Sequence, residues 1–179
     1  YYLTQRGTDP ISGYTLWAAD ADGARELLDG QRFWHLFAAK DGLVLVDVGC
    51  RVDGYCSDQT RTFWVGDAPH KEFRETMKLV RDAQQAALDK MRPGLPLHEA
   101  YTLARGVFEK AGVEAWFTHG LGHGVGLETH EAPSLGRRGD KVLQEGMVVT
   151  VEPGLYYPQW GGIRWEYTVL ITADGNRIL

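Results

Sequence analysis

The sequence predicts an α+β fold in which a curved, mainly antiparallel sheet carries helices on its outer side. Three observations predict this class: an apolar run with a returning strand near the middle of the chain, two amphipathic helical stretches after it, and a second strand pair near the end. Strand pairs that flank a pair of helices favour separate sheet and helix layers. The two strand pairs are alike in organisation, which indicates halves related by a pseudo-two-fold axis.

The first strand pair is predicted on either side of a tight turn. Leu43–Val48 is an apolar run rich in β-branched residues, which is typical of a buried strand. Asp53-Gly54 is a strong turn signal, and Asp58–Val65 alternates enough between polar and apolar residues to return as a second strand. These segments therefore predict a hairpin.

Two helices and a second strand pair are predicted after the hairpin. Residues 70–92 carry apolar side chains at helical spacing and are stopped by Pro93-Gly94, and residues 96–112 carry a second apolar stripe that ends at a glycine. Val148–Glu152 and Ile163–Ile171 then predict two strands, joined through glycine-rich turns.

Residues 1–42 show no clear pattern and are expected to form the front segment of the same domain. Ala18–Leu28 is compatible with a short helix that Gly23 weakens, whereas Thr15–Trp17 and Phe33–Phe37 are compatible with short strands or buried turns. His35 stands between aromatic residues, where a histidine is more often packed in a core than used as a ligand.

Composition bounds the class of protein. The chain has 179 residues, is 44% hydrophobic and 24% charged, and has a formal net charge of −5. An acidic balance argues against a nucleic-acid or anionic-membrane partner, and no apolar run approaches the ~20 residues that a membrane span requires. Cys50 and Cys56 form no C-x-x-C pair, so reduced thiols are expected, with a cross-hairpin disulfide as the alternative. The compartment expected from this cysteine usage is the cytoplasm.

Four acids stand where the strands end or return. Asp47 and Glu152 interrupt runs that otherwise predict buried strands, and Asp58 and Glu166 follow on the returning segments. Buried carboxylates that lie near one another repel, and bound cations resolve the repulsion. The set suits two divalent ions, with Mn²⁺ favoured and Co²⁺ or Zn²⁺ as alternatives. The other interpretation is that Arg61, Arg164 or backbone donors satisfy these acids.

A histidine- and glycine-rich segment follows the second predicted helix. Thr118–Pro133 contains His119, His123 and His130, and its alternating glycines make a regular helix improbable. Glycine at this density lets the backbone approach a metal ion or a substrate closely. A flexible turn with solvated histidines is the alternative interpretation.

Six short motifs resemble one known family of enzymes. The motifs are Asp47-Val48-Gly49, Ser57-Asp58-Gln59-Thr60-Arg61-Thr62-Phe63, Gly122-His123-Gly124-Val125-Gly126, His130-Glu131-Ala132-Pro133, Val151-Glu152-Pro153-Gly154 and Gly162-Ile163-Arg164-Trp165-Glu166. They look like the signature set of the pita-bread metallopeptidases, and within that superfamily they are most similar to aminopeptidase P and prolidase, the Xaa-Pro branch. The resemblance covers roughly residues 43–179.

The resemblance implies a metal-dependent hydrolysis of Xaa-Pro bonds by a metal-bridging hydroxide, within a dinuclear metallopeptidase core over residues 43–179. It implies five metal ligands, of which two bridge the ions: Asp47, Asp58 (bridging), His123, Glu152 and Glu166 (bridging). It also implies catalytic roles for Glu152 as the proton acceptor, His130 at the transition state, His119 at the substrate site, and Arg164 in holding the network or the substrate.

Several alternatives stay open at this point. Another pita-bread enzyme, a methionine aminopeptidase or a creatinase-like hydrolase, is the second hypothesis, and a non-catalytic peptide-binding member is the third. Trp165 and Tyr167 depart from the residues that the family usually places around Glu166. We expect a proline-containing peptide as the substrate, a homodimer as the assembly, and a catalytic core without the full architecture of the relatives.

Overall fold

The computed structural model describes residues 2–5, 14–20, 23–29 and 42–179, with side chains described from Gly42 onward. The elements are β1 (Tyr2–Gln5), β2 (Tyr14–Asp20), β3 (Gly23–Asp29), β4 (Gly42–Val48), β5 (Arg51–Val52), β6 (Tyr55–Cys56), β7 (Gln59–Val65), α1 (Lys71–Leu88), α2 (Leu97–Lys110), η1 (Glu114–Trp116), β8 (Gly122–Gly124), β9 (Glu131–Leu135), β10 (Val148–Val151), β11 (Gly154–Tyr157), β12 (Gly161–Arg164), β13 (Tyr167–Ile171) and β14 (Asn176–Ile178).

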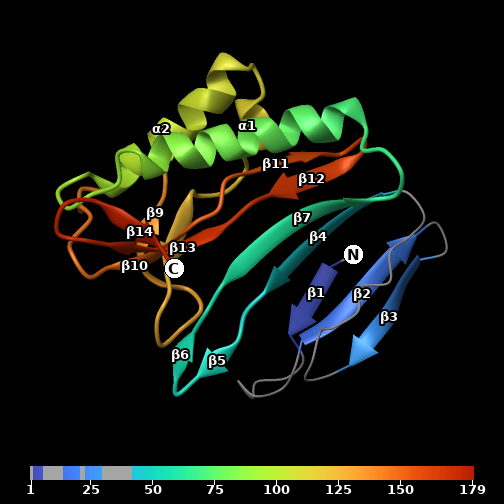
Figure 1. Ribbon diagram of the computed structural model, residues 1–179, viewed down its shortest axis with the longest axis horizontal. Coiled ribbons are helices and arrows are strands. Elements are labelled where there is room, and N and C mark those ends of the chain that lie inside the picture. Colours follow the sequence, from blue (N-terminus) through green and yellow to red (C-terminus); the bar gives the residue numbers. More distant parts are fainter. Residues whose placement is uncertain (1, 6–13, 21–22, 30–41) are drawn as a thin grey trace.

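The strands form antiparallel sheets, and the two long helices lie together on one side of them (Figure 1). A five-stranded sheet has the order β14-β13-β10-β8-β9, while β4 pairs with β7 and β11 pairs with β12. Every pairing among the described strands is antiparallel. This arrangement confirms the predicted α+β class, with helices outside a mainly antiparallel sheet.

The first predicted hairpin is present with its turn at the predicted place. β4 and β7 pair over seven positions, and Asp47 lies opposite Thr60. At the tip, Asp53 and Gly54 have positive φ angles of 51° and 88°, a conformation that suits a tight hairpin turn. Cys50 and Cys56 flank this tip as free thiols, so the disulfide alternative is wrong.

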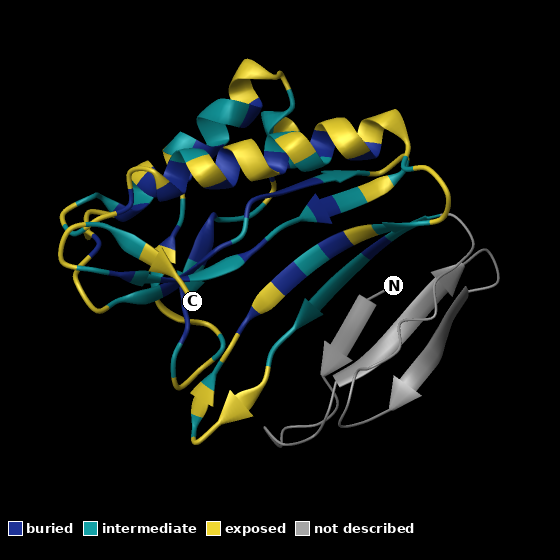
Figure 2. Cartoon of the chain, viewed as in Figure 1, coloured by how far each residue is buried: buried dark blue, intermediate teal, exposed yellow. Residues whose placement is uncertain are grey.

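Helix α1 packs its apolar face on the sheet and on α2 (Figure 2). It ends at Leu88, four residues earlier than predicted, and the side-chain amide of Asn176 donates to the carbonyl oxygens of Leu88 and Met91 at 2.7 and 2.9 Å. Helix α2 spans Leu97–Lys110, close to the predicted bounds. The core between the layers includes Val80, Phe108 and Val149, all fully buried.

Two predictions about local structure are wrong. Ala18–Leu28 forms no helix: β2 and β3 pair antiparallel, with Asp20 opposite Gly23, so strand pairing overrides the weak helical propensity around that glycine. Ile163–Ile171 is not one strand either. It breaks at Trp165-Glu166, because β12 pairs with β11 while β13 pairs with β10. The segment Phe33–Phe37 and His35 lie outside the described residues.

Candidate metal centre

The two predicted strand pairs each bring two carboxylates to the same cluster of side chains. Asp47 stands near the end of β4, and Asp58 immediately precedes β7. Glu152 follows β10, and Glu166 occupies the break between β12 and β13. Glu166 is only 1% exposed and Asp58 only 8%, so both carboxyl groups are removed from most of the solvent. The break that sequence analysis missed is therefore the point at which the chain presents Glu166.

His123 joins this cluster from the glycine-rich segment, which here forms the short strand β8. A Cβ at Gly122 would lie 1.9 Å from the carbonyl oxygen of Thr150, and one at Gly124 would lie 2.3 Å from that of Ala132. Only glycine on both sides of His123 allows its backbone to lie so close to its neighbours. His123 Nε2 lies 3.1 Å from Glu152 Oε1 and 3.7 Å from Asp58 Oδ2.

Arg164 is the cation that enters the acidic cluster. Its Nη2 donates to Asp47, its Nε lies 3.7 Å from Glu152 Oε2, and its Nη1 donates to the Tyr156 hydroxyl at 3.1 Å. Because one guanidinium contacts both Asp47 and Glu152, the two strand pairs share one site. Sequence reasoning missed Tyr156, although it lies only two residues after the Val151-Glu152-Pro153-Gly154 motif.

Arg61 does not neutralise the cluster. Its guanidinium donates to the backbone carbonyl of Glu166 and lies over the rings of Trp165 and Tyr167, 4.6 and 5.1 Å from their centroids. The two residues that depart from the family pattern thus hold Arg61 behind the site by cation–π contacts. Of the two arginines considered as partners for the acids, only Arg164 pairs with their carboxylates, so the interpretation that arginines satisfy all four is not supported.

Burial and the neighbouring carboxylates raise the pKa values of two of the acids, Asp58 and Glu166. Burial, followed by the charges of Asp47 and Glu152, raises the pKa of Asp58 to about 7. Burial, followed by the charges of Glu152 and Asp58, raises the pKa of Glu166 to about 8. Burial also opposes ionisation of His123, but the hydrogen bonds to Glu152 and to the Gly124 carbonyl outweigh it and raise the pKa of His123 to about 9. The site therefore holds protons that a bound cation would displace.

Two groups of side chains have the geometry to hold a cation. Among the residues that the structure describes, ligand atoms lie within 4.8 Å of one another in Asp47, Asp58 and Glu166, and again in Asp58, His123 and His130. Asp58 belongs to both groups, as a bridging ligand would. In addition, Glu166 Oε1 is buried without a hydrogen-bond partner, while Oε2 accepts from the Thr60 hydroxyl at 2.7 Å. These residues fit divalent cations in number, charge and chemistry.

The two remaining histidines of the segment take different positions. His130 is exposed to solvent, and its ring centroid lies 4.1 Å from that of His123. Its position therefore also suits a metal ligand, beside Asp58 and His123. His119 is half-buried, and its Nε2 lies 2.9 Å from the Tyr156 hydroxyl. Burial lowers the pKa of His119, which favours a neutral imidazole.

Thr150 and Thr60 were not singled out by sequence reasoning, and each joins two predicted residues. The Thr150 hydroxyl accepts the backbone N–H of His123 and donates to Glu152 Oε1, both at 3.0 Å. The Thr60 hydroxyl accepts from Arg164 Nε at 3.0 Å and donates to Glu166. Neither position carries a local signal of its role, because a threonine in a strand is common.

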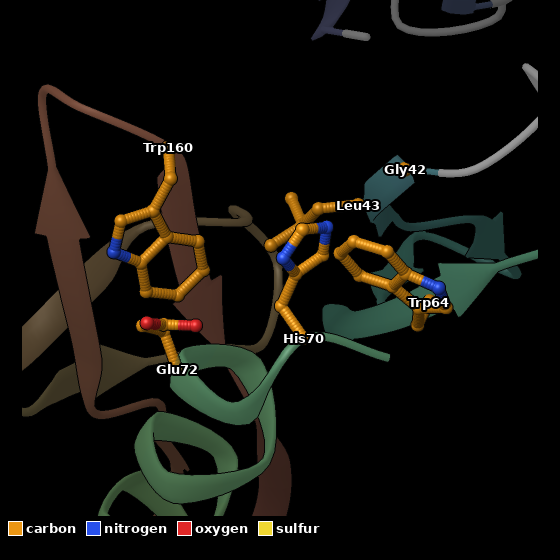
Figure 3. Close-up of a pocket in the computed structure, with 6 residues that line it drawn as sticks. All are labelled: Gly42, Leu43, Trp64, His70, Glu72 and Trp160. Carbon is orange, nitrogen blue, oxygen red and sulfur yellow. The ribbon is translucent and has the colours of Figure 1, made fainter. Parts of the chain in front are cut away.

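Two cavities that share Leu43 and Trp160 lie beside β4 and β12. One, of about 350 Å³, is lined by Trp64 and Trp160 with Leu43 and His70 between them, and by Glu72 (Figure 3). The other, of about 400 Å³, shares Leu43 and Trp160 and is also lined by Tyr156. Because the Tyr156 hydroxyl contacts Arg164 and His119, the second cavity borders the acidic cluster and the first lies farther from it.

A curved antiparallel sheet with outer helices and an oxygen-rich cluster of acids defines the class of pita-bread metallopeptidases. The sequence profile of metallopeptidase family M24 matches residues 7–173. The chain therefore belongs to metallopeptidase family M24. Within that family, its relatives and structural neighbours include enzymes named Xaa-Pro dipeptidase, prolidase and X-Pro aminopeptidase.

Two relatives illustrate the extent of the match. The Xaa-Pro dipeptidase of Pyrococcus furiosus is 44% identical over 137 residues, which are 76% of this chain and 39% of that protein. The uncharacterized peptidase YqhT of Bacillus subtilis is 44% identical over 179 residues, which are 100% of this chain and 50% of that protein. The chain thus spans half or less of the length of these relatives.

Solved structures agree with the sequence comparison. The prolidase from Pyrococcus furiosus superposes with a TM-score of 0.74 at 43% identity, covering 76% of this chain and 40% of that chain. The X-Pro aminopeptidase from Thermotoga maritima superposes with a TM-score of 0.74 at 37% identity, covering 76% of this chain and 38% of that chain.

Family membership implies that the chain binds divalent metal. None of the described helices is long and apolar enough to cross a membrane.

Proposed function

We propose that residues 43–179 form the catalytic core of an enzyme that hydrolyses Xaa-Pro bonds with the aid of two divalent cations, with residues 1–42 as the front segment of the same domain. The observation that supports this most directly is the pair of overlapping ligand groups that share Asp58. The names of the relatives, Xaa-Pro dipeptidase and prolidase, support the substrate class. A homodimer and a cytoplasmic location stay predictions.

The proposed ligands are the four carboxylates and His123, with Mn²⁺ as the preferred ion. Asp58 and Glu166 would bridge the two ions, Asp47 would complete one of them, and His123 with Glu152 would complete the other. When bound, the cations polarise the carbonyl group of the scissile bond and acidify the attacking water. Glu152 Oε1 lies 3.1 Å from His123 Nε2 and accepts a hydrogen bond from the Thr150 hydroxyl at 3.0 Å. These short distances support its place in the ligand set.

The protein groups around the ions are assigned as follows. Glu152 accepts the proton of the attacking water. Burial raises its pKa, but the hydrogen bond from His123 and the nearby positive charges outweigh burial and lower the pKa, so the carboxylate is ionised and free to take up a proton. Arg164 orients Asp47 and, through Tyr156, the substrate side of the site. Burial favours a neutral His119, and its Nδ1 lies 2.7 Å from the Gly120 carbonyl oxygen, so its Nε2 accepts a hydrogen bond on the substrate side of the site. His130 donates a hydrogen bond to the oxyanion that forms at the transition state.

A panel of substrates tests the proposed function. With Mn²⁺ added, we expect the protein to cleave Xaa-Pro dipeptides or the first bond of Xaa-Pro-Xaa tripeptides, and to leave Met-Ala-Ser and creatine intact. Release of the N-terminal amino acid is measured by chromatography, with EDTA-treated protein as the control. Preference for Met-Ala-Ser or creatine would favour the second hypothesis, and tight peptide binding without cleavage would favour the third.

Substitution of His130 separates its catalytic role from a role as a ligand. We expect His130→Ala to lower kcat by about a hundredfold or more, as removal of one oxyanion donor does elsewhere, while the bound Mn²⁺ per chain stays at the wild-type value. Activity and metal content are measured on the same samples. His98→Ala, on α2, serves as the control. A parallel loss of metal and activity would make His130 a ligand and correct the assignment.

A further inference from the structure

Gln84 is a polar residue placed in the apolar face of α1. It is only 3% exposed, and its helical neighbours Val80, Ala83 and Ala87 are fully buried in the core. Burying an amide costs free energy unless the amide is hydrogen-bonded, and an apolar side chain would pack equally well at this position. The partners of this amide therefore show why a glutamine suits the position.

The Gln84 amide nitrogen donates to two backbone carbonyls that are far apart in the sequence. Its Nε2 lies 2.7 Å from the Val151 oxygen and 3.1 Å from the Trp165 oxygen. Each carbonyl belongs to the peptide unit that enters a proposed metal ligand, Glu152 in one case and Glu166 in the other. A side-chain amide has two N–H donors, so one glutamine is able to hold both units at once.

The other side of each peptide unit is also held. The Glu152 N–H donates to the Leu121 carbonyl at 2.8 Å, and the Glu166 N–H donates to the Thr60 carbonyl at 3.2 Å. Leu121 and Thr60 lie two residues before His123 and two after Asp58, respectively. The backbone hydrogen bond of Glu152 thus ties it to the segment of His123, and that of Glu166 ties it to the segment of Asp58. Gln84 instead joins the Glu152 peptide unit to the Glu166 peptide unit.

We propose that Gln84 is a positioning residue that sets the spacing between Glu152 and Glu166 from helix α1, without contacting a metal ion or the substrate itself. This inference rests on the proposed metal centre. Both glutamates stand just outside regular strand pairing, where the sheet ladder no longer fixes the backbone. Ligand oxygens must be held to within about 0.5 Å for productive geometry, so two peptide units that drift apart weaken the site.

The test compares four substitutions by isothermal titration with Mn²⁺ and by thermal melting of the metal-free protein. Gln84→Met keeps the length of the side chain and removes both donors, and we expect Mn²⁺ affinity to fall about tenfold or more, as loss of a residue that orients a ligand does elsewhere. Gln84→Asn keeps the amide but is one methylene shorter, and we expect a smaller loss. Gln85→Met, at the exposed neighbouring position, is the matched control and is expected to bind Mn²⁺ as the wild type does.

A purely structural role is distinguished by Val80→Ala, which opens a cavity in the same helix interface. This variant is expected to lower the melting temperature without changing Mn²⁺ affinity. Wild-type affinity in Gln84→Met, or an equal loss of affinity in Val80→Ala at the same loss of stability, would overturn the inference. If Gln84→Met does not fold, the same comparison is made with Gln84→Asn. Failure of the wild type to bind Mn²⁺ would instead refute the proposed function.

Discussion

Asp58→Asn is expected to cost at least about a hundredfold in Mn²⁺ affinity and most of the activity, while the fold is kept. Asp58 is the residue shared by both candidate ligand groups, so its loss affects both proposed ions. A residue that only orients a ligand already contributes 10–100-fold to metal affinity in other proteins, and a bridging ligand contributes at least as much. The substitution preserves the size of the side chain, which limits damage to the packing around it.

For the metal-free protein, we expect the same substitution to preserve or raise the melting temperature rather than to weaken the protein. An asparagine carries no charge, so it removes the repulsion that Asp58 shares with Asp47 and Glu152. We therefore expect metal-free Asp58→Asn to melt at or above the wild-type temperature at pH 8. Asp53→Asn, in the exposed hairpin turn where asparagine tolerates the positive φ, is the control for both measurements. Wild-type Mn²⁺ affinity in Asp58→Asn would contradict the proposed ligand set.

The metal-free protein is expected to lose stability as the pH rises from 5 to 8. The pKa of Asp58 is raised from 3.8 to about 7 and that of Glu166 from 4.5 to about 8, so the folded state binds more protons than the unfolded state across this window. The free energy of unfolding therefore falls as the pH rises. His123, whose pKa is raised from 6.5 to about 9, acts in the same direction above pH 6.5. We expect a decrease of about 5–10 °C in melting temperature, equivalent to a few kcal/mol for a domain of this size.

Added Mn²⁺ should reverse this loss. Because the ions compete with protons for the same groups, metal affinity should increase from pH 6 to pH 8, and metal occupancy should fall as the pH drops. Stabilisation by a saturating ligand grows with its concentration relative to Kd, so the rise in melting temperature on adding Mn²⁺ should be larger at pH 8. Scanning calorimetry with and without the ion measures both effects. A metal-free melting temperature that is constant or rises from pH 5 to 8 would contradict the raised pKa values of Asp58 and Glu166 in the folded protein.

Local patterns predicted most of the elements that carry the candidate site. The apolar run before Asp47, the Asp53-Gly54 turn and the helical spacing of residues 70–92 each depend on neighbours in the chain, and each element forms close to the predicted bounds. The wrong predictions fall where distant pairing overrides a local preference. Pairing of β2 with β3 replaces the expected helix over Ala18–Leu28, and the competing partners β11 and β10 divide the expected strand at Glu166.

By itself, the sequence determined the candidate acids, the three histidines and the glycines around His123, because residue type and short spacing carry that information. The resemblance assigned a role to Arg164, but residue type does not separate it from the equally charged Arg61. Only the tertiary structure shows that Arg164 reaches the carboxylates of Asp47 and Glu152 and that Arg61 lies over Trp165 and Tyr167 instead. It likewise decided that Gln84 spans two carbonyls 67 and 81 residues away. Such contacts depend on how the helix and the sheets pack together, and a pattern among neighbouring residues does not predict contacts between residues so far apart in the sequence.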